Sequence, residues 1–142
     1  MSFFKTPEVE RRVQFMCIES KNIMGACINF VIDAGMVPVI TETVTTRGED
    51  EKLHRTSATH REGRAFDLRC KDWPTEVKLD FLSFIEDQYG SYGALSADGY
   101  PKIVHHHGEG DSEHMHVQVN KKYYNLARLS EFKLEKRGIE NV

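Results

Sequence analysis

The chain has 142 residues, of which 39% are hydrophobic and 29% charged, and its formal net charge at pH 7 is −3. These values are typical of a soluble globular protein. Because the net charge is negative, the overall charge does not attract nucleic acid, and we expect no nucleic-acid partner. The length suits a single domain with a sizeable core, so we expect residues 1–142 to form one domain and to act as a monomer.

The cysteines and the apolar segments indicate where the protein is made. Cys17, Cys27 and Cys70 lie in apolar patterns and lack a Cys-x-x-Cys spacing, so we expect reduced core residues of a cytosolic product. No apolar run approaches the roughly 18 residues of a membrane span, and the amino terminus lacks the apolar run of a signal peptide. The sequence therefore predicts synthesis in the cytoplasm, without a signal peptide and without a membrane partner.

The first third of the chain has helical and then extended patterns. Thr6 precedes a proline, which is a helix-start signal, and apolar residues then recur at three- or four-residue steps as far as Gly35. This pattern predicts one long helix, or two helices with a break near residues 20–22. Residues 37–46 are rich in β-branched side chains and predict a strand, and the polar residues 48–58 predict a loop.

The next segment, residues 59–68, brings a histidine and an aspartate together. Alternate side chains of an extended segment share a face, so Asp67 lies on the open face of a strand whose other face is buried. Gly63 permits a reversal that folds His60 back over that open face. An imidazole nitrogen and a carboxylate oxygen then lie within reach of one ion.

The later elements complete a small α+β domain. A helix is expected from Thr75 to Gly90, with a packing stripe, and residues 101–107 and 113–119 predict two strands of a hairpin. The packing stripe consists of Val77, Leu79, Phe81, Leu82 and Ile85. His105, His106 and His107 alternate between faces, so at most one or two of them face an ion beside Asp67. Residues 121–136 predict a final helix.

The second strand of this hairpin supplies a third ligand. Met115, Val117 and Val119 alternate with polar residues that include His114 and His116, which is the pattern of a half-buried strand. Catalytic zinc typically takes three nitrogen or oxygen ligands from the protein and leaves a position for water. His60, Asp67 and His116 form such a set, so we expect a bound Zn²⁺.

The order of these residues resembles a known family. His-x-x-Gly-x-Ala-x-Asp-Leu, from His60 to Leu68, is followed by Glu-x-x-His, from Glu113 to His116. This pattern is similar to that of the zinc peptidases that act on bacterial cell-wall peptides. They include D-alanyl-D-alanine carboxypeptidases and dipeptidases and the L-alanyl-D-glutamate endopeptidases of phage endolysins, and the hedgehog signalling domain shares their zinc scaffold. Ala58 departs from the family, which usually has serine there, and leaves Ser57 or Thr59 to make that hydrogen bond.

The resemblance spans roughly residues 37–120 and implies a fold and roles for further residues. The implied fold is α+β, with a small, mainly antiparallel sheet flanked by helices, as in the hedgehog domain and the D-alanyl-D-alanine peptidases. Glu113 occupies the position of the general base, for which Asp111, Glu109 and His114 are alternatives. His114 is also placed to polarise the scissile carbonyl. Arg47 follows the predicted strand at the position of a substrate-contacting arginine; a solvated loop arginine is the alternative.

These implications give the expected function. We expect a zinc-dependent peptidase that hydrolyses peptide bonds in peptidoglycan stem peptides, as an L-alanyl-D-glutamate endopeptidase of the phage endolysin type. The alternatives are a D-alanyl-D-alanine carboxypeptidase or dipeptidase, and a hedgehog-like zinc module that binds a partner without catalysis. A proton-transferring group beside an open zinc position distinguishes an enzyme from such a module.

Overall fold

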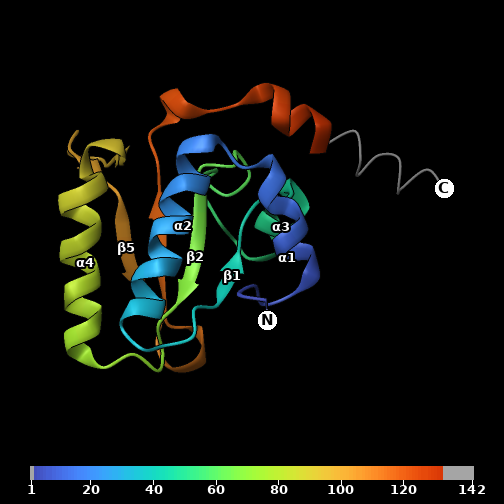
Figure 1. Ribbon diagram of the computed structural model, residues 1–142. Helices are drawn as coiled ribbons and strands as arrows, with labels where there is room; N and C mark the ends of the chain where they lie inside the picture. The colour runs from blue at the N-terminus through green and yellow to red at the C-terminus, as the bar shows by residue number, and fades with distance from the viewer. Residues whose placement is uncertain (1, 133–142) are drawn as a thin grey trace.

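A four-stranded antiparallel sheet is the centre of the fold (Figure 1). The computed structural model describes residues 2–132. The strand order is β1-β2-β6-β5, and these strands are β1 (Ile40–Glu42), β2 (Ala65–Arg69), β5 (Val104–His107) and β6 (His114–Gln118). A separate hairpin consists of β3 (Ala94–Leu95) and β4 (Pro101–Lys102). The expected α+β class with a small antiparallel sheet is therefore confirmed.

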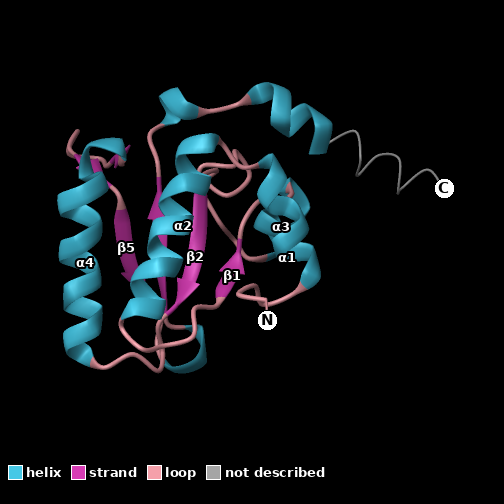
Figure 2. Cartoon of the chain, viewed as in Figure 1, coloured by secondary structure: helices cyan, strands magenta, loops and turns pink. Residues whose placement is uncertain are grey.

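Helices flank this sheet, as Figure 2 shows. They are α1 (Pro7–Arg11), α2 (Ile18–Asp33), α3 (Arg47–Lys52), α4 (Thr75–Tyr89) and a helix over residues 126–132. Short 3-10 turns are η1 (Arg12–Phe15), η2 (Gly90–Tyr92), η3 (Gly110–Ser112) and η4 (Lys121–Tyr123). Within residues 2–132, no helix has the length and apolar character needed to cross a membrane.

The core lies between the sheet and the helices α2 and α4. Its members include Phe66 and Leu68 of β2, Met115 and Val117 of β6, Cys27 and Val31 of α2, and Phe81 and Ile85 of α4. Burial of these side chains drives the sheet and helices together. Because side chains alternate along a strand, Asp67 and His116 are then directed to the opposite face of the sheet. The three cysteines are buried in this core as free thiols.

The helical segment before Gly35 is broken earlier in the chain than the sequence predicts. Thr6 caps α1 as expected, because its hydroxyl accepts a hydrogen bond from the Val9 amide at 3.2 Å. The break lies at Met16 and Cys17, where the backbone is extended, and not at residues 20–22. The cause is tertiary: the Cys17 amide donates to the Gly63 carbonyl at 3.0 Å, which anchors the turn that carries His60.

The segment after Gly35 also differs from the prediction. Only Ile40–Glu42 pairs as a strand, and Arg47–Lys52 forms α3, although residues 48–58 are expected to form a loop. Thr46 and Glu49 form a reciprocal capping box, which is the local signal that favours this helix. The Thr43 hydroxyl donates to the Val9 carbonyl at 2.8 Å. Thr43 therefore packs against α1 and does not extend β1.

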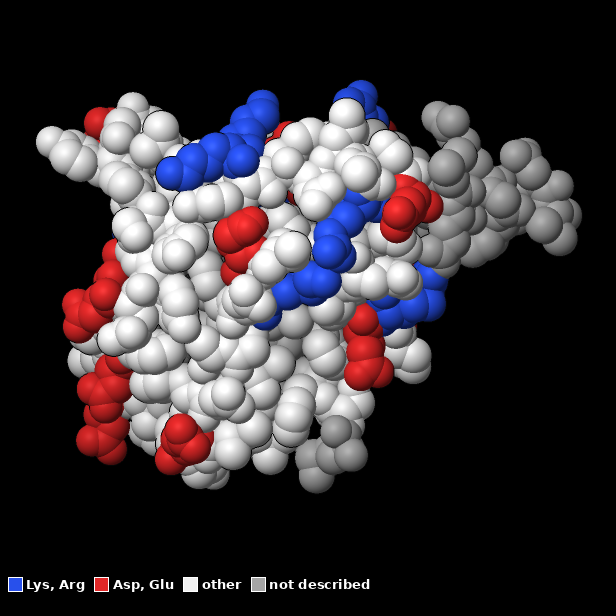
Figure 3. All heavy atoms as spheres, turned by 45° about the horizontal axis from the view of Figure 1, so that its top comes forward, with Lys and Arg blue, Asp and Glu red and all other residues white. Residues whose placement is uncertain are grey.

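The expected helix after Pro74 is confirmed as α4, which ends at Tyr89 with Gly90 as its C-cap. Phe81 and Ile85 are fully buried, but Leu79 is 60% exposed and does not belong to the packing stripe. Acidic side chains gather on the left side of Figure 3, where α4 lies, and both signs of charge appear elsewhere on that face. The helix is therefore amphipathic, with a solvated outer surface.

The predicted hairpin is confirmed, because β5 and β6 pair antiparallel. A single final helix is expected over residues 121–136, but residues 121–132 form two separate helical segments. Lys121–Tyr123 forms η4, and the α-helix begins only at residue 126, where the Asn125 side chain accepts a hydrogen bond from the Arg128 amide at 3.2 Å. Asparagine is a strong N-cap residue, so it starts a new helix there. Residues 133–136 of the prediction lie outside the described residues.

Candidate metal centre

The open face of the sheet presents two rows of polar side chains across three neighbouring strands. In one row, Asp67 of β2 pairs with His116 of β6, which pairs with His105 of β5. In the adjacent row, His114 of β6 pairs with His107 of β5. Cross-strand partners on one face have their Cβ atoms about 5 Å apart. Strand register alone therefore brings these side chains together.

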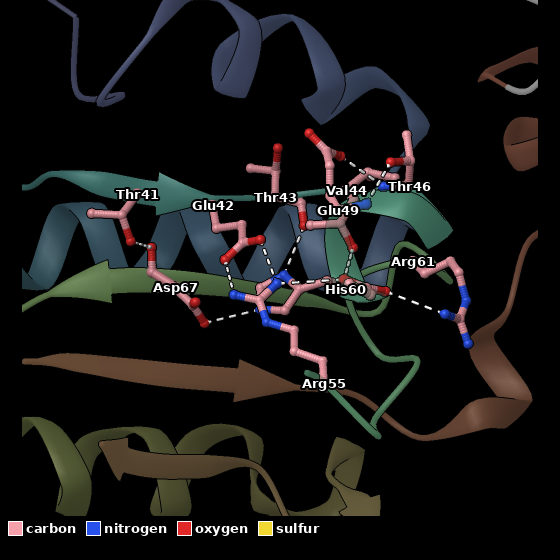
Figure 4. Close-up of polar contacts among 12 residues, drawn as sticks. Thr41, Glu42, Thr43, Val44, Thr46, Glu49, Arg55, His60, Arg61 and Asp67 are labelled. Atoms are coloured by element: carbon pink, nitrogen blue, oxygen red, sulfur yellow. Dashed lines mark hydrogen bonds and ion pairs between the residues drawn. The ribbon is translucent and has the colours of Figure 1, made fainter. Parts of the chain in front are cut away.

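His60 joins the first row from the turn that precedes β2. Gly63 has a φ of +69°, and an added Cβ would lie 2.8 Å from the Phe15 carbonyl oxygen, so the turn requires glycine. The turn places His60 Nε2 3.1 Å from Asp67 Oδ1, and His116 Nδ1 lies 2.9 Å from the same oxygen. Figure 4 shows His60 and Asp67 pointing toward each other. The predicted ligand set is thus assembled, with its donor atoms within 4.8 Å of one another.

Hydrogen bonds on the outer side of each imidazole determine which nitrogen faces the centre. His60 Nδ1 lies 2.7 Å from the Thr43 carbonyl, which can only accept, so Nδ1 carries a proton. His116 Nε2 donates to Gln118 Oε1 at 3.1 Å, while the Gln118 amide nitrogen donates to the Lys102 carbonyl at 3.2 Å. In the neutral imidazoles, His60 Nε2 and His116 Nδ1 therefore present lone pairs to the centre.

This arrangement requires a positive charge at the centre. Two nitrogen lone pairs face a carboxylate oxygen, and three acceptors repel one another unless protons or a metal cation lie between them. Carbonyl and amide groups that orient ligating histidines in this way are typical of metal centres. Two imidazoles and one carboxylate are also ligands that Zn²⁺ prefers. His60, Asp67 and His116 therefore form a group that could hold a metal ion, and their donor types fit zinc.

Burial and neighbouring charges shift the pKa values of His60 and Asp67 in opposite directions. His60 and Asp67 are each only 5% exposed. Burial opposes ionisation of Asp67, but the charge of His60 and the hydrogen bond from His116 outweigh it and hold the Asp67 pKa well below its ordinary value. Burial likewise disfavours charged His60, and the attraction of Asp67 outweighs it and raises the His60 pKa. Without a metal, protons thus take the place of the cation.

The ligands line one side of an open cavity of about 470 Å³. Its remaining lining residues are His54, Arg55, Thr56, Ser57, Thr59, His105, His107, His114 and Gln118. His105 and His107 face this cavity and His106 does not, as strand alternation predicts. His54 reaches the cavity from the polar segment 48–58. It adopts a φ of +55°, which is uncommon outside glycine, but no sequence pattern marks it.

The structure separates the two residues for which the sequence predicts proton transfer or carbonyl activation. His114 lines the cavity, with Nε2 3.8 Å from Asp67 Oδ2. Glu113 precedes β6 and lies on the opposite face, where its carboxylate contacts Lys78 Nζ at 2.8 Å and His106 Nε2 at 2.5 Å. These contacts hold the Glu113 pKa below its ordinary value. Glu113 is therefore not brought to the metal ligands.

The alternatives to Glu113 also lie away from the cavity. The Asp111 side chain is 95% exposed and pairs with Lys71 at 2.8 Å, and Glu109 is exposed in the turn before η3. Among the residues that the structure describes, Asp67 is the one carboxylate that lines the cavity. Apart from Asp67, which is a candidate ligand, the described residues thus place no carboxylate where it could transfer a proton in the cavity.

A different arginine from the expected one lines the cavity. Arg47 is the exposed first residue of α3 and does not line it. Arg55 does, and its guanidinium pairs with both carboxylate oxygens of Glu42, each at 2.5 Å (Figure 4). Hydrogen bonding to Glu42 raises the Arg55 pKa although partial burial opposes it. Helix α3 lies between the two arginines in the chain. Arg47 is its first residue, and Arg55 follows it and lines the cavity with the candidate ligands.

Of the two hydroxyl residues beside Ala58, Thr59 is the one that reaches a candidate ligand. Thr59 Oγ1 lies 3.4 Å from His116 Nε2, whereas Ser57 reaches only Thr59, at 3.3 Å. Thr59 is 5% exposed, so this contact is shielded from water.

Comparisons with known proteins do not extend this assignment. No family model, no curated protein and no solved structure matches the chain. The chemistry of the centre is therefore inferred from its own residues and their geometry.

Proposed function

We propose that this protein is a zinc-dependent peptidase that hydrolyses peptide bonds in peptidoglycan stem peptides. The observation that carries the proposal is the convergence of His60, Asp67 and His116 beside an open polar cavity. Their order and spacing, with Gly63 between the first two, support the resemblance to the cell-wall peptidases. Within that class we propose an L-alanyl-D-glutamate endopeptidase of the phage endolysin type, acting on the wall after its release from the cytoplasm.

His60, Asp67 and His116 would hold the zinc. When bound, zinc supplies Lewis acidity that activates water and polarises a carbonyl. Thr43 and Gln118 keep the two imidazoles in the ligating tautomer through their hydrogen bonds to His60 Nδ1 and His116 Nε2. Asp67 supplies a negative charge that offsets half of the charge of a divalent ion.

His114 is the residue best placed to move a proton in this cavity. Its Nδ1 lies 2.7 Å from the Ser112 carbonyl and must donate to it, so in the neutral ring Nε2 is the free acceptor. Nε2 is also the nitrogen that faces Asp67, at 3.8 Å. A histidine held in this tautomer can accept a proton at Nε2 from water and return it to the leaving amine. The sequence-based role of Glu113 as the base stays a prediction.

Arg55 is proposed to contact the substrate. Within the described chain it is the one lysine or arginine that lines the cavity. Stem peptides carry free carboxylates, and guanidinium groups bind carboxylates through parallel hydrogen bonds. The pairing with Glu42 orients the guanidinium and leaves N–H donors for a substrate.

One observation favours a second candidate, the zinc module that binds a partner without catalysis. Glu113, the base implied by the family resemblance, is engaged by Lys78 and His106 on the far face of the sheet. If His114 cannot replace it, the centre holds zinc but lacks a proton-transferring group.

The test is incubation of the zinc-loaded protein with purified peptidoglycan and with defined stem peptides, followed by mass spectrometry. We expect new amino termini without new reducing ends, and cleavage between L-alanine and D-glutamate. His116→Ala is the matched control and should release nothing. Release of terminal D-alanine would identify the carboxypeptidase alternative. Reducing ends would overturn the proposal, since a glycosidase needs two spaced carboxyl groups. Zinc binding without any cleavage would favour the binding module.

A further inference from the structure

A second cluster of metal-ligating side chains lies on the helix-covered face of the sheet, opposite the first centre. Cys70 follows β2, His106 belongs to β5 and Glu113 precedes β6. One donor atom from each lies within 4.8 Å of the others. The Cys70 amide also donates to the Glu113 carbonyl at 3.2 Å, so the backbone holds two of the three residues together. The proposed peptidase uses none of these groups except, in the sequence-based prediction, Glu113.

The donor types in this cluster suit a borderline divalent ion. Thiolate, imidazole and carboxylate together are ligands of Zn²⁺, whereas Mg²⁺ and Ca²⁺ take oxygen ligands. Cys70 is fully buried, whereas the His106 side chain is 37% exposed, so the cluster reaches the surface at His106. His106 also lines a surface groove of about 370 Å³, together with Glu86 and Lys102.

We infer that Cys70, His106 and Glu113 form a second binding site for a divalent ion of the zinc class. The ion takes the Cys70 sulfur, His106 Nε2 and a Glu113 oxygen as ligands. The Cys70 S–H bond breaks and its proton passes to solvent, and in neutral His106 the ring proton moves from Nε2 to Nδ1. His106 Nε2 and Glu113 Oε2, now 2.5 Å apart, separate to about 3.3 Å, the spacing of two tetrahedral zinc ligands.

Lys78 is the competitor of the ion at this site. Its ammonium lies 2.8 Å from Glu113 Oε2 and neutralises that carboxylate while the Cys70 thiol is uncharged. Binding of the ion displaces it, and because lysine has a long flexible stem the ammonium can turn toward solvent from α4. Removal of this charge should therefore strengthen metal binding.

An occupied second site would stabilise the first one and determine the role of Glu113. It would link the end of β2, which carries Asp67, to β5 and to the start of β6, which carries His116. Because Glu113 would be a ligand on the far face, it would not transfer protons in the cavity.

Cobalt substitution tests this inference in the full-length protein, independently of any peptide cleavage. A thiolate ligand gives Co²⁺ an intense charge-transfer band in the near ultraviolet, whereas the nitrogen and oxygen ligands of the first centre do not. We expect two Co²⁺ ions per chain and a thiolate band. His116→Ala should keep the band and bind one ion fewer. Cys70→Ser should lose the band and keep the first ion.

Two further variants complete the test. His106→Ala changes a partly exposed side chain and should also lose the band, so the inference remains testable if Cys70→Ser does not fold. Lys78→Met should bind the second ion about tenfold more tightly, because no ammonium then competes with the ion for the Glu113 carboxylate. One Co²⁺ per chain without a thiolate band, or an unchanged band in Cys70→Ser or His106→Ala, would overturn the second site.

Discussion

Asp67 and His116 are direct cross-strand partners in β2 and β6, and His116 Nδ1 lies 2.9 Å from Asp67 Oδ1. Forty-nine residues separate them in the chain, so this contact depends on strand register. A slip of one residue would move one side chain to the opposite face of the sheet. The buried partners on the helix side, Phe66 with Val117 and Leu68 with Met115, prevent that slip because it would expose them. The hydrophobic core thus maintains the candidate metal centre.

The metal-free protein should lose stability on both sides of an intermediate pH range. The Asp67 pKa is lower in the folded state than in the unfolded state, so its contribution is present above the unfolded pKa and is lost as pH falls through the folded value. The His60 pKa is raised, so its contribution is present below the unfolded pKa and is lost as pH rises through the folded value. Urea unfolding across this range measures both effects.

Zinc should remove the alkaline loss, because the ion replaces the protons between the ligands. At a free zinc concentration one hundred times the dissociation constant, the free energy of unfolding should rise by about 2.7 kcal/mol. The control is His60→Gln, in which the loss at alkaline pH should disappear and the only stabilisation by zinc should be that of an ion bound at the second site. A metal-free wild type that becomes more stable as pH rises above neutral would contradict this account.

His114→Gln and Glu113→Gln should separate the two candidates for proton transfer. Because His114 Nε2 faces the cavity and Glu113 does not, His114→Gln should lower kcat by roughly a hundredfold, the scale for a lost general base. Glu113→Gln should leave kcat within about threefold of wild type, a change too small for the loss of a base. Zinc content of the first centre serves as the control in both variants. The opposite ranking would return the role of base to Glu113 and require that side chain to move.

Arg55 and Arg47 form a matched pair for substrate contact. Arg55→Lys keeps a positive charge beside Glu42 but loses bidentate geometry, so KM for a stem peptide should rise by about tenfold while kcat changes little. Arg47→Lys should change neither, because Arg47 does not line the cavity. For a peptide whose carboxylate has been amidated, wild type and Arg55→Lys should have similar KM values. A KM difference between them that survives amidation would mean that Arg55 acts on something other than the carboxylate.

Gly63→Ala should destabilise the protein more than Gly35→Ala. Both glycines have positive φ, but a Cβ at Gly63 meets the Phe15 carbonyl oxygen at 2.8 Å, and nothing lies within 4 Å of one at Gly35. Conformational strain alone costs on the order of 1 kcal/mol, and the clash at Gly63 should add at least about as much again. Urea denaturation gives the difference between the two variants. Equal destabilisation would show that the turn can shift without disturbing residues 15–17.

Local rules are sufficient to place the three candidate ligands. Alternation along β2 and β6 assigns Asp67 and His116 to the open face, and the glycine in the turn returns His60 to it, so the three ligands can be predicted from the sequence. Alternation also distinguishes His105 and His107 from His106. These features depend on the two-residue period of a strand and on the backbone freedom of glycine, and both act over a few residues.

Tertiary packing decided which other residues reach the cavity. Residues 47–52 form α3, and this helix leaves Arg47 exposed while the segment after it brings Arg55 to the ligands. Glu113 is held on the far face by Lys78, which belongs to α4, more than thirty residues earlier in the chain. The break before α2 likewise depends on the hydrogen bond from Cys17 to Gly63. The three candidate ligands follow from the sequence because the placement of each is a property of one strand or one turn, whereas contacts between distant segments depend on how the whole core packs.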